Sequence, residues 1–241
     1  MIVSPNQPTT NRSAKSRIMR ACAGALAVVA VGVGISGCSG DSSDPIKLGV
    51  PQGEATSAKM GQREAASLGL YYHHALEKTD PETNAKFKVE RVVIDPKNRI
   101  DDLRTGKVQV TFGCVGELLE LLDAHKAQQL RGMYGKEDKP DPAKWRDITH
   151  STMMATLPAG VAASDPGIAS ICSDKSLPQN IVALYANESL KRFDRRQLNN
   201  VAGGVSTEML GSPESDQLDE SAGKTQAEGV ESGDSPKAGM K

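Results

Sequence analysis

IKLGVPQGEAT, residues 46–56, is the stretch that decides the fold class. Its first five residues form an apolar run of strand length that stops at a proline, and a polar turn follows. A helix pattern comes next, with apolar or small residues three and four positions apart on one face: Ala65, Leu68, Tyr72, Ala75 and Leu76. We expect Thr56 or Ser57 to cap this helix and Asp80-Pro81 to end it. The stretch is therefore the strand–turn–helix start of an α/β layer.

The same alternation continues towards the C-terminus, with weaker patterns in the second half. Strands are expected at 87–94, 108–112 and 180–185, and helices at 98–105, 115–130, 142–156 and 188–200, with a last turn at 206–210. The apolar stripe of the helix expected at 115–130 is Val115, Leu118, Leu119 and Leu122, and the candidate core contacts of the helix expected at 142–156 are Trp145, Ile148 and Met153. Strands that alternate with helices predict an α/β fold on a mostly parallel sheet.

The N-terminus has the three parts of a secretory signal. Four basic residues without an acidic one precede an apolar run from Ala21 to about Ile35, which is shorter than a membrane-spanning helix requires. The run ends in Ile35-Ser36-Gly37-Cys38, which resembles the lipobox of bacterial lipoproteins. This resemblance implies a signal peptide at 1–37, a lipid such as palmitate on Cys38 and a location on the extracytoplasmic face of the cell membrane. An ordinary signal peptide with an incidental cysteine is the alternative.

Composition sets the remaining boundaries of the chain. Residues 38–45 are a polar tether, residues 46–210 are long enough for one domain, and residues 211–241 are too poor in apolar side chains to fold. We predict a disordered tail, with a partner-binding tail as the alternative. Without 1–37 the chain holds 25 basic and 30 acidic residues, a net charge of about −5, which argues against nucleic acid as a partner.

The cysteine count predicts one disulfide. Of the four cysteines, Cys22 leaves with the signal and Cys38 takes the lipid, so Cys114 and Cys172 remain as a pair in an oxidising compartment. Their bond would close a loop of about 58 residues and contribute on the order of 3–4 kcal/mol. Two buried free thiols are the alternative.

Several segments together resemble the glycine betaine, choline or osmoprotectant class of extracytoplasmic solute-binding proteins of ABC importers. They are 46–50 with 53–56 and the helix that follows, then 99–110 with 113–119, and finally 177–184 with 198–207. The resemblance covers about Ile46–Leu210. It implies one lobe like that of type II periplasmic binding proteins, and because the segment between Leu130 and Cys172 is short, the second lobe is reduced or absent.

The resemblance also implies where a solute would bind. In such folds a ligand lies beside the carboxyl ends of parallel strands, where turns and helix N-termini expose backbone donors. Here that edge includes Gln52, Glu54 and Thr56 after the first strand and Thr111 and Gly113 at the third. Glu54 would face a cationic solute. Turn chemistry and helix capping are the alternative roles of these residues.

Other chemistry finds little support in the sequence. His73 and His74 are adjacent on a helix, so their side chains diverge by about 100° and we expect surface histidines rather than a metal site. The nucleophile-elbow, zinc-protease and phosphate-loop motifs are absent from the 241 residues, so we expect neither an enzyme nor a bound cofactor. The basic run Lys191–Arg196 is either a solvated helix face or a surface for anionic headgroups or a transporter subunit.

The sequence therefore predicts a lipid-anchored solute-binding component of an ABC-type uptake system. It would deliver a small polar or cationic solute, such as glycine betaine or choline, to a membrane permease. A protein of another class is the alternative, namely a single-lobe envelope lipoprotein that acts as an interaction module without binding a solute.

Overall fold

The structure is a computed structural model that describes residues 44–53 and 59–211. The predictions for the signal peptide, Cys38, most of the tether, Glu54, Thr56 and the tail from 212 onward lie outside the described residues. The strands are β1 (Ile46–Pro51), β2 (Val89–Ile94), β3 (Val110–Cys114), β4 (Val161–Ala163) and β5 (Ile181–Ala186). The helices are α1 (Gln62–Leu76), α2 (Arg99–Arg104), α3 (Val115–Leu122), α4 (Ala124–Tyr134), α5 (Pro142–Met154), α6 (Arg192–Gly204) and α7 (Thr207–Gly211).

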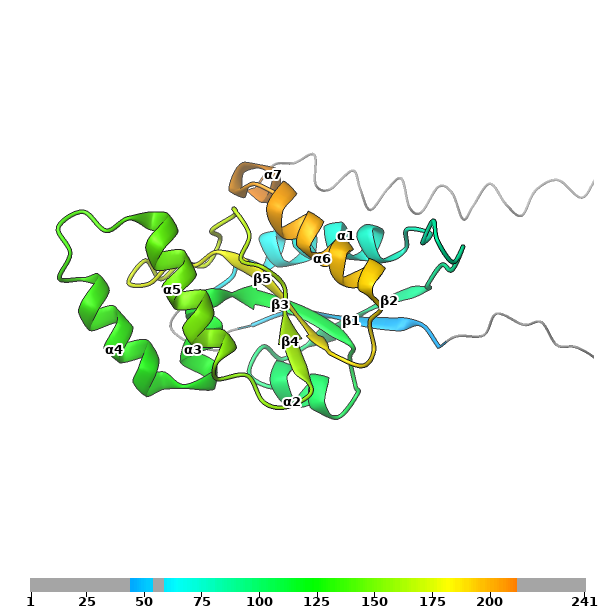
Figure 1. The fold of residues 1–241 in the computed structure, drawn as a ribbon, viewed down its shortest axis with the longest axis horizontal. Coiled ribbons are helices and arrows are strands. Elements are labelled where there is room, and N and C mark those ends of the chain that lie inside the picture. The colour runs from blue at the N-terminus through cyan, green and yellow to red at the C-terminus, as the bar shows by residue number, and fades with distance from the viewer. Residues whose placement is uncertain (1–43, 54–58, 212–241) are drawn as a thin grey trace, which may run out of the picture. The chain divides into compact units, whose positions relative to one another are not determined.

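The five strands form one sheet in the order β2-β1-β3-β5-β4 (Figure 1). β1 pairs in parallel with β2 and with β3, whereas β5 pairs antiparallel with both β3 and β4. Four strands therefore point one way and β5 points the other way. The prediction of an α/β fold with a mostly parallel sheet is confirmed.

Helices cover both faces of this sheet (Figure 1). Side chains alternate along each strand, so in β5 Ile181, Ala183 and Tyr185 join one core cluster while Val182 and Leu184 join the other. The first cluster contains the buried residues of α1, α6 and α7, and the second contains those of α2, α3, α4 and α5. All five residues of the predicted α1 stripe are buried in the first cluster.

Three local predictions are wrong. Helix α1 starts at Gln62 with Gly61 as its N-cap, so Thr56 and Ser57 do not cap it. The carboxylate of Glu64 lies instead over this helix N-terminus, where the macrodipole favours negative charge. The expected helix at 115–130 is two helices, because the extended backbone of Asp123 ends α3 and its carboxylate accepts a hydrogen bond from the Lys126 amide at 3.0 Å to cap α4.

Strand β4 is the third difference, because it lies between the helix expected at 142–156 and the strand expected at 180–185, where the sequence predicts no element. β4 forms because the edge of β5 that does not pair with β3 provides a hydrogen-bonding partner. Three residues are too few to show the alternating pattern that predicts a strand. In the part of the chain that the structure describes, no helix is long and apolar enough to cross a membrane.

Candidate functional site

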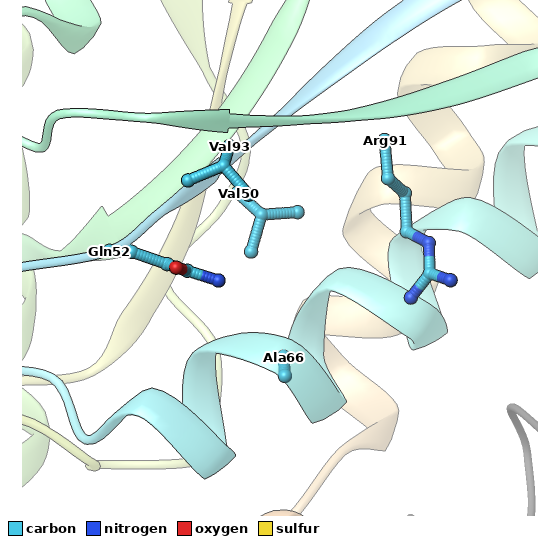
Figure 2. Close-up of a pocket in the computed structure, with 5 residues that line it drawn as sticks. All are labelled: Val50, Gln52, Ala66, Arg91 and Val93. Carbon is cyan, nitrogen blue, oxygen red and sulfur yellow. The ribbon is translucent and has the colours of Figure 1, made fainter.

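A pocket of about 410 Å³ lies beside the carboxyl ends of β1 and β2, under the N-terminal half of α1 (Figure 2). Three of its lining residues, Val50, Val93 and Ala66, are apolar. The other two bring polar groups: the Gln52 amide extends from the end of β1, and the Arg91 guanidinium extends from β2 towards α1. The pocket thus combines an apolar floor with an amide and a cation.

The sheet register explains why these residues meet. Val50 pairs with Val93 across β1 and β2. Just beyond this pair, the backbone amide of Gln52 donates a hydrogen bond to the carbonyl of Ile94 at 3.0 Å. Arg91 and Val93 are two residues apart, so both project from the same face of β2. Helix α1 approaches this face closely at Gly69, where an added Cβ would meet Val50 at 3.1 Å. The pocket stays open on the β2 side, where Val93 is 62% exposed.

Of the predicted ligand-binding residues, only Gln52 lines this pocket in the described part of the chain. Thr111 is fully buried, and its hydroxyl donates to the Gly49 carbonyl at 2.9 Å, so it fastens β3 to β1. Gly113 is also buried, as the last but one residue of β3, where it pairs with Val182 of β5. The structure therefore separates Gln52 from Thr111 and Gly113, while Arg91, Val93 and Ala66 are lining residues that the sequence reasoning missed.

A buried ion pair explains the glycine at 113. The guanidinium of Arg99 contacts the Glu117 carboxylate through both terminal nitrogens, at 2.7 and 3.2 Å, and the two side chains are 1% and 3% exposed. Arg99 also donates to the carbonyls of Pro96 and Phe112. A Cβ on Gly113 would lie 2.3 Å from this guanidinium. Gly113 therefore makes room for the ion pair.

Glu117 has a second role at the start of α3. Its carboxylate accepts a hydrogen bond from the backbone amide of Cys114 at 3.3 Å, and its own amide donates to the Gln179 side chain at 3.1 Å. The ion pair thus ties α2, the β3–α3 turn and the start of β5 together at the carboxyl edge of the sheet.

The predicted disulfide between Cys114 and Cys172 is confirmed. Both cysteines are fully buried at the same edge of the sheet, against Met60 and Ile171. Cys172 forms a β-bridge with Met60, and Ser173 exchanges two hydrogen bonds with Lys59. The disulfide therefore anchors the chain that leads into α1 to the end of β3.

Tyr71 and Tyr72 of α1 both pack against the first core cluster. Tyr72 is fully buried and stacks on Phe112 with a centroid distance of 5.6 Å, and this burial raises the pKa of its hydroxyl. Tyr71 is partly buried against the same cluster. None of the described residues that line the pocket is aromatic, so these residues offer no aromatic cage for a quaternary ammonium group.

The basic run Lys191–Arg196 borders a second pocket of about 270 Å³, across from the turn at Asp80. The pocket has mixed charge, because acidic Asp80 lines it together with residues of the basic run. The Asp80 carboxylate accepts hydrogen bonds from the Glu82 amide and the Thr83 hydroxyl, and these bonds lower the pKa of Asp80. Asp194 is buried, which raises the pKa of its carboxyl group, and it caps α6 by accepting from the Lys191 amide at 2.9 Å. These contacts explain Asp80 as a turn residue and Asp194 as a cap residue.

Comparison of the sequence with protein-family models and with curated proteins gives no match. Among solved structures, the chain is similar to a TRAP periplasmic solute-binding protein from Desulfovibrio desulfuricans with bound sn-glycerol-3-phosphate, at 13% identity and a TM-score of 0.41, over 77% of this chain and 84% of that chain. It is also similar to a sugar acid binding protein from Advenella mimigardefordensis in complex with galactonate, at 11% identity and a TM-score of 0.35, over 77% and 84% of the two chains.

The two neighbours are not of the glycine betaine class that we expected from the sequence. With TM-scores below 0.5, they carry no argument about the ligand or the transport system of this chain.

Proposed function

We propose that this protein is a lipid-anchored, extracytoplasmic solute-binding component of an ABC-type uptake system. The observation that carries the proposal is the pocket at the carboxyl ends of β1 and β2. In open α/β sheets ligands bind in the crevice outside these strand ends, and a volume of about 410 Å³ lies in the range of pockets for small molecules. The lipid on Cys38 would hold the protein beside its permease.

The lining residues favour a solute that carries a carboxylate. An arginine guanidinium binds carboxylates with charge-assisted hydrogen bonds, and the Gln52 amide adds a donor on the other side of the pocket (Figure 2). Glycine betaine has a carboxylate, whereas choline carries a hydroxyl in its place. We therefore propose glycine betaine, or another small zwitterion, over choline.

Thermal unfolding of the purified protein tests this proposal against glycine betaine, choline, carnitine, proline and other amino acids. A solute at one hundred times its Kd stabilises the folded state by about 2.7 kcal/mol, which raises the midpoint by a few degrees. We expect a carboxylate-bearing solute to raise the midpoint and choline to leave it unchanged.

Two substitutions show whether the effect arises in the pocket. Arg91→Gln should abolish the shift because it removes the cation from the pocket. Arg104→Gln is the matched control, since Arg104 is more than half exposed and lies outside this pocket. A shift that survives Arg91→Gln, or that Arg104→Gln also abolishes, would rule out carboxylate binding at this site.

One observation favours a single-lobe interaction module as the second candidate. Val93 is 62% exposed on β2, and β2 ends the described sheet, so it has an open edge. Exposed edges are places where a partner adds a strand. A protein that melts cooperatively and shifts with none of these solutes would favour this candidate.

A further inference from the structure

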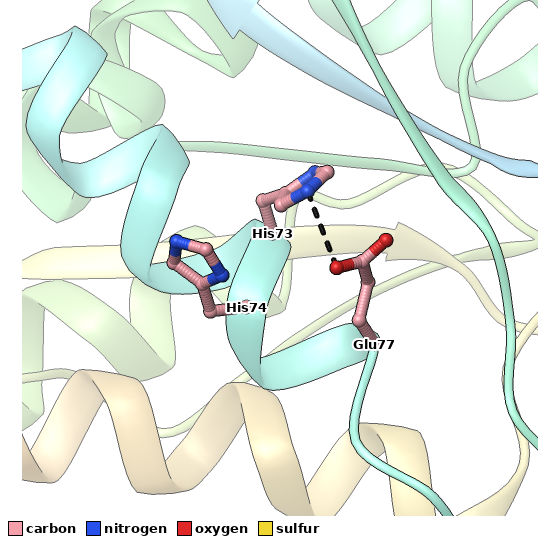
Figure 3. Close-up of side chains that lie close together, drawn as sticks. All are labelled: His73, His74 and Glu77. Atoms are coloured by element: carbon pink, nitrogen blue, oxygen red, sulfur yellow. Dashed lines mark ion pairs between the residues drawn. The ribbon is translucent and has the colours of Figure 1, made fainter. Parts of the chain in front are cut away.

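Three side chains of types that can bind a metal lie close together at the C-terminal end of α1 (Figure 3). One ligand atom from each of His73, His74 and Glu77 lies within 4.8 Å of the other two. His73 Nε2 is 3.4 Å from Glu77 Oε2. Neither histidine nor Glu77 lines the pocket at Val50 and Gln52, so this group is a separate feature of the helix.

Helix geometry explains a convergence that the adjacent histidines alone do not provide. Successive residues turn by about 100°, so His74 projects about 100° from His73. Glu77 is four residues after His73, which places it about 40° beyond His73 and therefore between the two histidines. Glu77 is the C-cap of α1 and keeps helical backbone angles. Glu77 therefore lies between the two histidines, whose side chains diverge by about 100° when they are considered alone.

The spacing fits a first-row divalent metal. Zinc binds imidazole nitrogen and carboxylate oxygen at about 2.0–2.2 Å, so two ligands of a tetrahedral site lie roughly 3.4 Å apart. His73 and Glu77 already have this separation. The His74 ring stands edge-on to His73, at a centroid distance of 5.4 Å, and a side-chain rotation brings its nitrogen closer. The three residues are all partly exposed, which leaves room for that rotation and for entry of the ion.

Two further features support a cation here. The group lies at the C-terminal end of a 15-residue helix, where the macrodipole favours positive charge. The donor set, two imidazoles and one carboxylate, suits zinc and related transition metals rather than magnesium or calcium, which prefer oxygen ligands. The other group of this kind among the described residues, Cys114, Cys172 and Glu117, is ruled out because its sulfurs form a disulfide.

We propose that His73, His74 and Glu77 bind one zinc-class divalent ion through three protein ligands. The fourth coordination position then remains for water or for a group from a partner. This site is independent of the proposed solute pocket, since Ala66, the pocket residue on α1, lies seven residues before His73, about 10 Å along the helix axis.

Calorimetric titration of the tag-free, metal-stripped protein tests the proposal, with its free thiols alkylated and its disulfide intact. ZnCl2 should bind with a stoichiometry of one, and MgCl2 should not bind. Loss of a residue that only orients a metal ligand typically weakens affinity about 10–100-fold, so His74→Ala and Glu77→Gln should each weaken zinc binding by at least about tenfold.

His125→Ala is the matched control, because His125 is an exposed histidine on α4. It should leave zinc affinity unchanged. Zinc binding that His74→Ala leaves intact, binding that His125→Ala weakens equally, or no binding at all would overturn the proposal. Metal-free thermal midpoints of the variants should equal that of the parent protein, which separates loss of the site from loss of the fold. Because the solute pocket is not involved, these outcomes do not depend on whether a solute binds.

Discussion

Replacing Glu117 with glutamine should cost this fold about 3–5 kcal/mol of its free energy of unfolding. The variant keeps the shape of the side chain but removes its charge, which leaves the Arg99 guanidinium buried with its charge uncompensated. Both side chains are almost fully buried, at 1% and 3% exposure. Breaking a buried pair by removing one partner is costly in this range, because the remaining charge has lost its hydration without gaining a counter-ion.

An exposed ion pair on α2, the helix that carries Arg99, provides the control. Arg104 and Asp101 of α2 are 3.4 Å apart, but they are 57% and 76% exposed. Pairs of this kind contribute less than about 1 kcal/mol, so Asp101→Asn should change stability little. The two substitutions make the same chemical change, from carboxylate to amide, and they differ mainly in burial.

Urea unfolding with the disulfide intact measures both variants. With a slope of about 2 kcal/mol/M, Glu117→Gln should lower the midpoint by about 2 M. In a double-mutant cycle, Arg99→Met combined with Glu117→Gln should be less destabilised than the sum of the two single variants, by about 2 kcal/mol. If Glu117→Gln costs no more than Asp101→Asn, the reasoning about the buried pair is refuted.

Two further predictions concern the same edge of the sheet. Cys114→Ala with Cys172→Ala should lower the free energy of unfolding by about 4 kcal/mol, because the oxidised chain closes a 58-residue loop that restricts the unfolded state; a urea midpoint equal to that of the oxidised parent would contradict this. Gly113→Ala should destabilise the fold by about 1–3 kcal/mol, since the new Cβ meets the Arg99 guanidinium in a packed interior; adding Arg99→Met should remove most of that clash, and an unchanged cost in the double variant would contradict it.

The sequence predicts those parts of the fold that depend on local periodicity. Apolar spacing identified β1 and the buried face of α1. In the stripe of α3, Val115, Leu118 and Leu119 are buried, and Leu122 is partly buried. Trp145 and Met153 are core residues, and Ile148 is partly buried beside them. The disulfide followed from the cysteine count and from the compartment. These inferences succeed because each requires only neighbours in sequence or a short process of elimination.

The parts that the sequence did not predict depend on contacts between distant residues. Arg99 belongs to a short charged helix, α2, and is buried because its guanidinium contacts Phe112 of β3 and Glu117 of α3. Apolar periodicity within α2 does not predict these contacts between elements. One signal was present: Glu117 is the one charged residue between Val108 and Leu119, three positions after a helix N-cap, which is typical of a capping box. Arg91 lies at the pocket because β2 pairs with β1. Glu77 lies near the two histidines because it follows His73 by four residues, which is about one helical turn.

Amide chemical-shift mapping by NMR tests the central claim most directly. Glycine betaine is titrated into the isotopically labelled protein, with choline as the matched compound that lacks a carboxylate. We expect glycine betaine to shift the amide signals of the residues that line the pocket and choline to leave them in place. These residues are Val50, Gln52, Ala66, Arg91 and Val93. Shifts that gather elsewhere on the described domain, or equal shifts with both compounds, would contradict a carboxylate-binding pocket between β1, β2 and α1.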